Sequence, residues 1–351
     1  MLLRQNSSPD TSVRFSGMVS RLKAVQGDLT ALAGRADGGS DLSKSFVDLQ
    51  TLRKRASELF AESLALATAP VIRTQRLDEG ACDIADRLLI DISRAIGIEW
   101  PHFTTLAESE FFGTSAQIVR LRYPGPSVWD LPVAVHELGH FCGPNWPPPL
   151  DDSPYEALMA HTALGGRNHR EEYFADLFAV FVLGPAYAWT CAIERFDPMR
   201  GDTDSHPSDA RRFIWILRGL ELLGESAETE SARVIRGWTQ RLQSLWDDAM
   251  SACRQTIAPE DRNGLRSHAA QTWKRLNRSG SAAMYRDLRG AMMLVADYRD
   301  GRPRPTAPIR DLRDVLTAAW LVRLDESGLA RRADTRAVER WAMQLLLGDR
   351  R

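Results

Sequence analysis

The chain has 351 residues, 44% of them apolar, so it can bury a hydrophobic core and form one large domain or two to three smaller ones. Its 45 Lys and Arg nearly balance its 46 Asp and Glu, which excludes attraction to nucleic acid or to an anionic membrane by net charge alone. Four cysteines without a CxxC pair indicate reduced thiols rather than a disulfide framework.

Neither a signal peptide nor a membrane span is predicted. The first segment, MLLRQNSSPDTSVRF, holds an apolar stretch too short for a signal peptide, which favours a cytoplasmic protein. The longest apolar run, residues 177–193, is interrupted by Gly184-Pro185 and is shorter than the ~20 residues that cross a bilayer. It predicts a buried core helix instead.

The N-terminal region, residues 1–70, is expected to be helical after a ragged start. Residues 1–40 are rich in Ser, Gly and Asp, which is typical of irregular structure and a linker with one helix at most. Apolar residues then recur every three or four positions from 41 to 68, which predicts an amphipathic helix ended by Ala69-Pro70. A second such helix follows and stops at Gly97.

Alternating residues in SAQIVRLRY, ending at Tyr123, predict a strand whose edge could receive an extended peptide. A turn and Pro132 then start a helix that carries LPVAVHELGHFCG. The proline-rich segment 143–154 predicts a loop that forms a wall or lid, with Trp146 near the substrate; a plain surface connector is the alternative.

The rest of the chain reads as helical. One helix is expected from His169 to about Ile193, and nearly everything beyond Ser208 has helical periodicity. The predicted fold class is therefore mainly α with a small β-sheet. We place an α+β core at residues 71–215 and a C-terminal helical region at residues 216–351.

The stretch HELGH carries the candidate chemistry. His136 and His140 are four residues apart, so on a helix both imidazoles can bind one metal ion. Glu137 lies one step round the helix, where it can act as a general base on a water molecule, as in the HExxH motif. A pair of packed helix histidines is the structural alternative.

A second acidic helix would complete the metal site. Glu172 and Asp176 are four residues apart within an apolar segment, where a carboxylate needs a partner or a metal. We expect Glu172 to be the third ligand and Asp176 to accept the free ring N–H of a ligating histidine, with His136 favoured. Glu171 is the alternative ligand.

These motifs resemble the gluzincin metallopeptidases, in which HExxH is completed by a downstream ExxAD-like helix. EYFADLFAVFVLGP is similar to the second helix of the ImmA/IrrE-type regulatory proteases, and SHPSDARR is similar to an element of the HtpX-like and CAAX-prenyl peptidases. The resemblance implies a minigluzincin-like core and a Zn²⁺ cofactor. It also implies that His206 and Arg212 lie near the site as donors to the developing oxyanion.

The function expected from these features is a zinc-dependent endopeptidase that cleaves a specific intracellular protein or peptide, a regulator being one candidate. The alternatives are a helical interaction or regulator-binding protein with a non-catalytic zinc site, and a nucleic-acid-binding module. Nucleic acid is disfavoured, because the last arginines alternate with acidic and apolar residues, which is typical of a solvated helix face. Those arginines are Arg331, Arg332, Arg336 and Arg340.

Overall fold

The computed structural model describes residues 11–37, 41–100, 103–107, 111–113, 118–122, 127–147, 153–302, 305–324 and 334–348. The chain forms two compact units. Unit 1 comprises Met1–Asp83 with Pro101–Gly125, and unit 2 comprises Ile84–Trp100 with Pro126–Arg351. The predicted boundaries at residues 70/71 and 215/216 fall inside helices α2 and α8.

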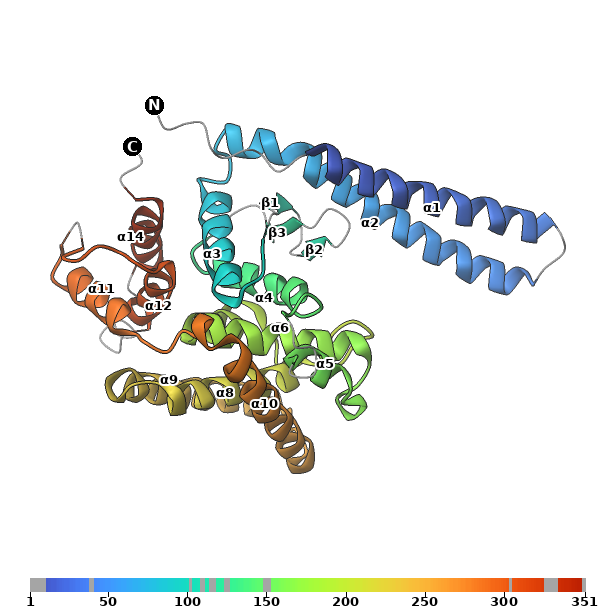
Figure 1. The fold of residues 1–351 in the computed structure, drawn as a ribbon. Coiled ribbons are helices and arrows are strands. Elements are labelled where there is room, and N and C mark those ends of the chain that lie inside the picture. The colour runs from blue at the N-terminus through green and yellow to red at the C-terminus, as the bar shows by residue number, and fades with distance from the viewer. Residues whose placement is uncertain are drawn as a thin grey trace. The chain divides into compact units, whose positions relative to one another are not determined.

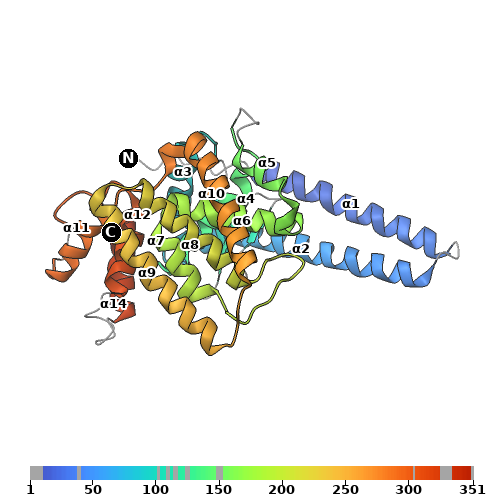
Figure 2. The ribbon, with the colours of Figure 1, turned by 90° about the horizontal axis from the view of Figure 1, so that it is seen from below.

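The described chain is mostly helical, which confirms the mainly α prediction (Figures 1 and 2). Among the described residues, the strands are β1 (Phe103–Ala107), β2 (Phe111–Gly113) and β3 (Ile118–Arg122). The α-helices are α1 (Thr11–Asp37), α2 (Leu42–Thr74), α3 (Ala81–Ile96), α4 (Leu131–Cys142), α5 (Pro154–Met159), α6 (Arg167–Leu183), α7 (Pro185–Thr190), α8 (Asp209–Ser226), α9 (Thr229–Ala252), α10 (Pro259–Gly280), α11 (Arg289–Arg299), α12 (Leu312–Arg323) and α14 (Thr335–Leu347). Single turns of 3₁₀- or π-helix occupy Thr162–Leu164, Cys191–Arg195 and Ser281–Ala283.

Helices α1 and α2 of unit 1 form a long antiparallel hairpin, drawn in blue in Figure 1. Two ion pairs set its register: Arg35 Nη2 lies 3.2 Å from Asp48 Oδ2, and Arg55 Nη1 lies 3.3 Å from Asp28 Oδ2. The two residue numbers of each pair add up to 83, as expected for residues that face each other across antiparallel helices. The segment before residue 40 is therefore a helix over most of its length.

The prediction that the second of these helices ends at Ala69-Pro70 is wrong, because α2 continues through Pro70 to Thr74. A proline inside a helix removes one backbone hydrogen bond and clashes with the preceding turn. Tertiary contacts offset that loss here. The last turns of α2 pack on β1, and Arg73 Nη1 donates a hydrogen bond to the carbonyl oxygen of Thr104 at 3.1 Å.

The three strands form one small sheet in the order β1-β3-β2. Strand β3 pairs with β1 in parallel and with β2 in antiparallel orientation. It falls within the segment predicted to be a strand, but it is the central strand of the sheet. The prediction that this strand offers a free edge to a peptide is therefore wrong, because both of its edges are already hydrogen-bonded.

In unit 2, α4 packs along α6, and α8 and α10 pack on the other sides of α6. Every residue of α6 from Glu172 to Leu183 is buried, which explains why this helix carries apolar residues on all sides. The expected single helix from His169 to Ile193 is wrong in its bounds. Gly184 adopts φ +60° and ends α6, and Pro185 starts α7 in a new direction.

The C-terminal part of unit 2 is helical, as expected beyond Ser208. Arg336 and Arg340 lie on α14, while Arg331 and Arg332 fall outside the described residues. Within the described part of the chain, no helix is both long enough and apolar enough to cross a bilayer.

Candidate metal centre

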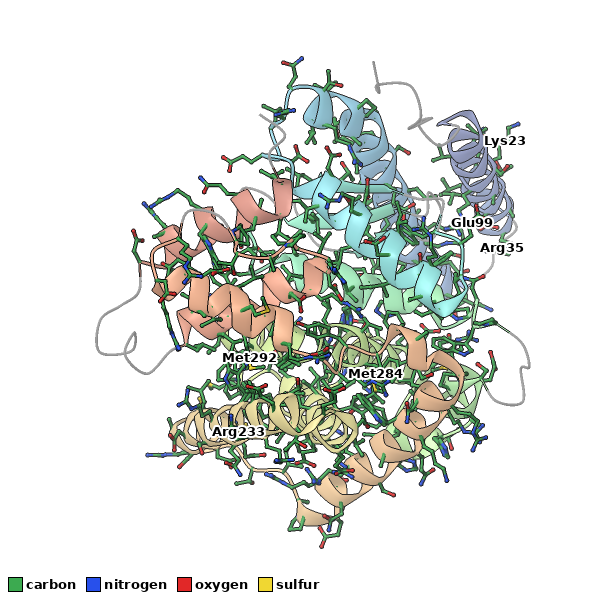
Figure 3. All side chains as sticks on the ribbon, turned by 60° about the vertical axis from the view of Figure 1, so that its left-hand side comes forward. Lys23, Arg35, Glu99, Arg233, Met284 and Met292 are labelled. Atoms are coloured by element: carbon green, nitrogen blue, oxygen red, sulfur yellow. The ribbon has the colours of Figure 1, made fainter. Side chains whose placement is uncertain are left out.

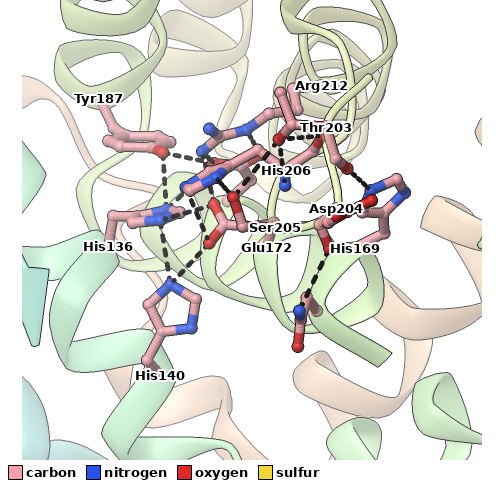
Figure 4. Close-up of polar contacts among 12 residues, drawn as sticks. His136, His140, His169, Glu172, Tyr187, Thr203, Asp204, Ser205, His206 and Arg212 are labelled. Atoms are coloured by element: carbon pink, nitrogen blue, oxygen red, sulfur yellow. Dashed lines mark hydrogen bonds and ion pairs between the residues drawn. The ribbon is translucent and has the colours of Figure 1, made fainter. Parts of the chain in front are cut away.

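Helix α4 presents His136 and His140 on one face, because residues four apart in a helix lie one above the other. Their Nε2 atoms point towards each other at a distance of 3.2 Å (Figure 4). His136 is buried, with 5% of its surface exposed, whereas the His140 side chain is 21% exposed. One side of the pair therefore faces the core and the other has access to solvent.

Helix α6 brings Glu172 against both rings. Glu172 Oε2 lies 3.3 Å from His136 Nε2, and Glu172 Oε1 lies 3.4 Å from His140 Nε2. A tetrahedral zinc ion with bonds of about 2.0–2.1 Å separates its ligand atoms by about 3.3–3.4 Å. The three residues have their ligand atoms within 4.8 Å of one another and could hold one metal ion.

The surroundings of Glu172 also fit a cation. Its Oε2 atom is buried and has no hydrogen-bond partner among the residues that the structure describes. Burial alone would raise the pKa of this carboxyl group, but the charge of Arg212 and the two histidines lower the pKa well below its usual range. Glu172 is thus an ionised, buried carboxylate whose Oε2 makes ion-pair contacts of 3.3 Å with His136 and Arg212 but no hydrogen bond, and a bound metal ion would give it a closer partner.

Asp176 lies one turn further along α6 and is fully buried. Its Oδ1 atom lies 3.1 Å from His136 Nδ1 and accepts hydrogen bonds from Tyr187 OH at 2.6 Å and Arg212 Nη2 at 2.7 Å. Arg212 Nε donates to its Oδ2 at 2.8 Å. Burial raises the pKa of Asp176, but Arg212 and His136 outweigh it and lower the pKa to about 2. The carboxylate is therefore fixed and charged.

The two carboxylates determine the state of His136 in the metal-free protein. Burial lowers the pKa of this imidazole, but hydrogen bonds and charge from Asp176 and Glu172 outweigh burial and raise the pKa to about 10. The two carboxylates thus favour a positive charge at this position. With Asp176 at Nδ1, the Nε2 atom is the one directed at His140 and Glu172.

Glu137 is buried, with 9% of its surface exposed. It makes no hydrogen bond or ion pair with any residue in the described part of the chain. Its carboxylate oxygens are not among the buried unpaired side-chain atoms, so they keep access to water. That is the environment expected for a base that acts on a water molecule.

His206 and Arg212 both lie at the site. His206 Nε2 is 3.5 Å from Glu172 Oε1, and Arg212 Nη2 is 3.3 Å from Glu172 Oε2. The side chain of His206 is 41% exposed, whereas that of Arg212 is 11% exposed. Burial lowers the pKa of His206, which favours its neutral form. The two residues therefore differ in environment: His206 is at the solvent side, and Arg212 is held by both carboxylates.

The segment that carries His206 is anchored to the start of α6. His169 Nε2 lies 2.6 Å from the carbonyl oxygen of Thr203, and Asn168 Nδ2 donates to the carbonyl oxygen of Asp204 at 3.2 Å (Figure 4). His206 itself contacts Ser205 Oγ through Nδ1 at 2.8 Å. The same helix therefore supplies one candidate ligand and fixes the segment that carries His206.

No protein-family model, curated protein or solved structure matches this chain. The candidate site is therefore described by its own geometry.

Two other residues considered in the sequence, Glu171 and Trp146, lie outside the metal group. Glu171, the alternative ligand, accepts hydrogen bonds from Tyr155 OH at 3.0 Å and Arg167 Nε at 2.8 Å. Trp146 is 4% exposed and donates through Nε1 to Ser279 Oγ at 3.0 Å. The prediction that Trp146 lines a substrate channel is wrong, because its large apolar ring packs against Phe174 and Phe178. Residues 148–152 of the predicted lid lie outside the described residues.

Tyr187 was not predicted. It is buried on α7, and its hydroxyl lies 3.0 Å from His136 Nδ1 as well as 2.6 Å from Asp176. The sequence signal is weak, since GPAYAWT reads as ordinary core. Only the break at Gly184 brings this tyrosine back to the metal site.

Proposed function

We propose that this protein is a zinc-dependent endopeptidase of the gluzincin type, which cleaves a specific protein substrate in the cytoplasm. One observation carries the proposal: His136, His140 and Glu172 present a three-ligand set with tetrahedral spacing beside the buried, unpaired Glu137. Three protein ligands are typical of catalytic zinc sites, whereas structural sites use four.

Zinc bound by these ligands would supply Lewis acidity towards a peptide carbonyl and would lower the pKa of a water molecule to about 7. Glu137 accepts the proton of the attacking water and later delivers it to the amine of the leaving peptide. Its lack of a protein partner supports this role, because no ion pair has to be broken first. Asp176 holds His136 in the tautomer that leaves Nε2 free to bind the metal.

His206 and Arg212 take different parts in this proposal. His206 is half-exposed and its Nε2 lies at the candidate site, 3.5 Å from Glu172 Oε1, so it can donate to the oxygen that becomes negative during attack. Arg212 donates hydrogen bonds through Nε and Nη2 to Asp176, and its side chain is only 11% exposed. It acts as a positioning residue that keeps Asp176 and Glu172 ionised and in place.

The test uses the purified full chain. Wild type should contain about one zinc per chain and should cleave an unstructured protein such as casein. Glu137→Gln should keep zinc, circular dichroism spectrum and melting temperature, but lose activity by at least about 10²-fold, because only the base is removed. Glu171→Gln is the matched control and should stay active. An active Glu137→Gln protein would contradict the assigned base.

One observation favours a second candidate, a non-catalytic zinc site in a helical interaction protein. His206 Nε2 lies close enough to Glu172 to become a fourth ligand after a small movement, and four ligands would close the site. His206→Ala separates the two cases. In a peptidase it should lower kcat and leave zinc content unchanged, whereas in a closed site it should release zinc.

A further inference from the structure

The α1–α2 hairpin leaves many large apolar side chains exposed. Single exposed apolar residues are common on proteins, but a continuous set of them marks an interaction surface. The exposed residues on the hairpin are Val19 (47%), Leu22 (44%) and Leu29 (40%) of α1, and Phe46 (62%), Val47 (63%), Leu49 (43%), Phe60 (69%), Leu64 (54%) and Val71 (58%) of α2.

On α2 all but one of these residues share a single stripe. The seam towards α1 is marked by the buried Leu52 and Leu59, seven residues apart. With 3.6 residues per turn, each residue advances by about 100° around the helix. The stripe then lies about 80–140° from the seam, and Val47 lies on the opposite side. The stripe consists of Phe46, Leu49, Phe60, Leu64 and Val71.

On α1 the exposed apolar residues are offset in the same rotational sense. The buried Val25 and Leu32 mark its seam. Relative to them, the three exposed residues of α1 lie about 40–120° round the helix. When the hairpin is viewed along its long axis, successive residues turn clockwise in one helix and counter-clockwise in the other, because the two helices are antiparallel. The same positive offset therefore points to the same broad side of the hairpin on both helices.

The register joins the two stripes into one surface. The pairs Arg35–Asp48 and Arg55–Asp28 place residue n of α1 beside residue 83 − n of α2. Val19 is therefore level with Leu64, and Leu22 is level with Phe60 to within one residue. We call this surface the hairpin face. It comprises Val19, Leu22, Leu29, Phe46, Leu49, Phe60, Leu64 and Val71.

We propose that the hairpin face binds the hairpin face of a second copy of this chain, so that two hairpins form a four-helix bundle. Two antiparallel helices with one apolar side are half of such a bundle. The face runs from residue 46 to 71, about 38 Å, across two helices, which gives about 700–800 Å². That area reaches the roughly 800 Å² per partner of a stable protein interface.

A two-fold axis also suits the charges of the face. Arg53 lies within the α2 stripe by the same rotation, and Lys23, labelled in Figure 3, lies at the edge of the α1 stripe. The apolar residues are centred near residue 58 of α2, so a two-fold axis there separates the two Arg53 positions by about 15 Å along the helix axis. Their long stems can cover apolar surface while the charges reach the edge.

The test is the mass of the full-length protein in solution. Size-exclusion chromatography with light scattering should give twice the chain mass of 39.3 kDa for wild type. Phe60→Glu combined with Leu64→Glu puts four acidic groups into the apolar centre of the bundle and should halve this mass. Both residues are exposed in the single chain, so zinc content and circular dichroism should not change.

Two control variants test the assigned face. Val47→Glu alters an equally exposed residue on the other side of α2 and should remain a dimer. Phe60→Leu keeps an apolar side chain in the face and should remain a dimer as well. A wild-type chain that is monomeric at every concentration overturns the proposal, and so does a monomer that binds lipid vesicles through these residues. A Phe60→Glu, Leu64→Glu protein that stays dimeric also overturns it.

Discussion

Gly139 of α4 lies directly against Ala175 of α6. A Cβ atom at position 139 would come within 2.8 Å of the Ala175 Cα atom and 3.2 Å of its Cβ atom. Real side chains do not approach backbone this closely, so only glycine fits here. Gly139 lies between His136 and His140, and Ala175 lies between Glu172 and Asp176. This close contact of the two helices is therefore at the level of the candidate metal ligands.

Gly139→Ala should destabilise the protein and weaken its metal site. The new methyl group meets backbone, which cannot move aside without shifting α4 or α6, so we expect a loss of about 1–3 kcal/mol in the free energy of unfolding. Zinc affinity should fall as well, because the shift separates the histidines from Glu172. Urea denaturation and zinc titration measure the two effects.

Gly264→Ala is the control for this substitution. Gly264 lies inside α10 and has open space around its Cα atom. Alanine there removes backbone freedom from the unfolded chain without a clash, so we expect no change or a gain of up to about 1 kcal/mol. Equal destabilisation by both substitutions would mean that the close helix contact is not the cause.

His140→Ala should abolish stabilisation by zinc. A ligand that binds only the folded protein at about 100 times its Kd raises the free energy of unfolding by about 2.7 kcal/mol. We expect this increase for wild type and none for His140→Ala or Glu172→Ala. His161→Ala is the control, because His161 packs against His268 and is not part of the metal group. Zinc that stabilises His140→Ala as much as wild type would contradict the ligand assignment.

Asp176→Asn and Tyr187→Phe should both weaken zinc binding without removing a ligand. Asn keeps the shape of Asp176 but loses the charge that orients His136, so we expect a loss of about 10 to 100-fold in affinity. Tyr187→Phe removes one hydrogen-bond donor to Asp176 and should have a smaller effect. Tyr155→Phe removes a hydroxyl from Glu171 and should leave the affinity unchanged. Isothermal titration with zinc distinguishes the three.

Asp314→Asn should stabilise the protein above pH 6. Burial and the charge of Asp311 raise the pKa of Asp314 to about 6, against a hydrogen bond from Tyr285. The unfolded chain releases this proton near pH 4, so the folded state holds more protons between about pH 4 and 6. Stability therefore falls as pH rises through this window. Asparagine does not titrate and so removes this loss of stability. We expect the free energy of unfolding at pH 7 to rise by about 1–2 kcal/mol.

Asp297→Asn should have the opposite effect and lower the free energy of unfolding. The backbone N–H of Thr306 and the side chains of Thr306 and Arg302 donate hydrogen bonds to Asp297 and lower its pKa. Asp297 therefore stabilises the folded protein above the pKa that its carboxyl group has in the unfolded chain. This stabilisation is lost as the pH falls through the lower pKa of the folded state. Removing the charge should destabilise the protein at pH 7. Melting curves from pH 4 to pH 8 on both variants test the two signs together.

The helices could be predicted from the sequence where a strong local signal exists. The stop at Gly97 and the start of α4 near Pro132 follow from residues that fix backbone geometry, and the structure has both. Pro70 and Gly184 show the limit. Pro70 carries a stop signal that packing on β1 overrides, and Gly184 divides a continuous apolar pattern. Periodicity could foresee neither outcome.

The candidate site was predictable to the extent that it rests on helical spacing. His136 with His140, and Glu172 with Asp176, share faces because four residues nearly complete one helical turn. Tyr187 and His169 could not be found in this way. Their contribution depends on the direction of α7 and on the loop that carries His206, both of which are tertiary features.

The carboxylate of Asp176 fixes the candidate metal site in the folded protein. His136, Tyr187 and Arg212 all contact this carboxylate. The His136 ring therefore loses its rotational freedom when the chain folds, before a metal ion binds. Binding to such a preorganised site costs little conformational entropy. The affinity for different metal ions should then depend on how well the radius of each ion fits the nearly fixed space between the three candidate ligands. The ion that fits best should also dissociate most slowly.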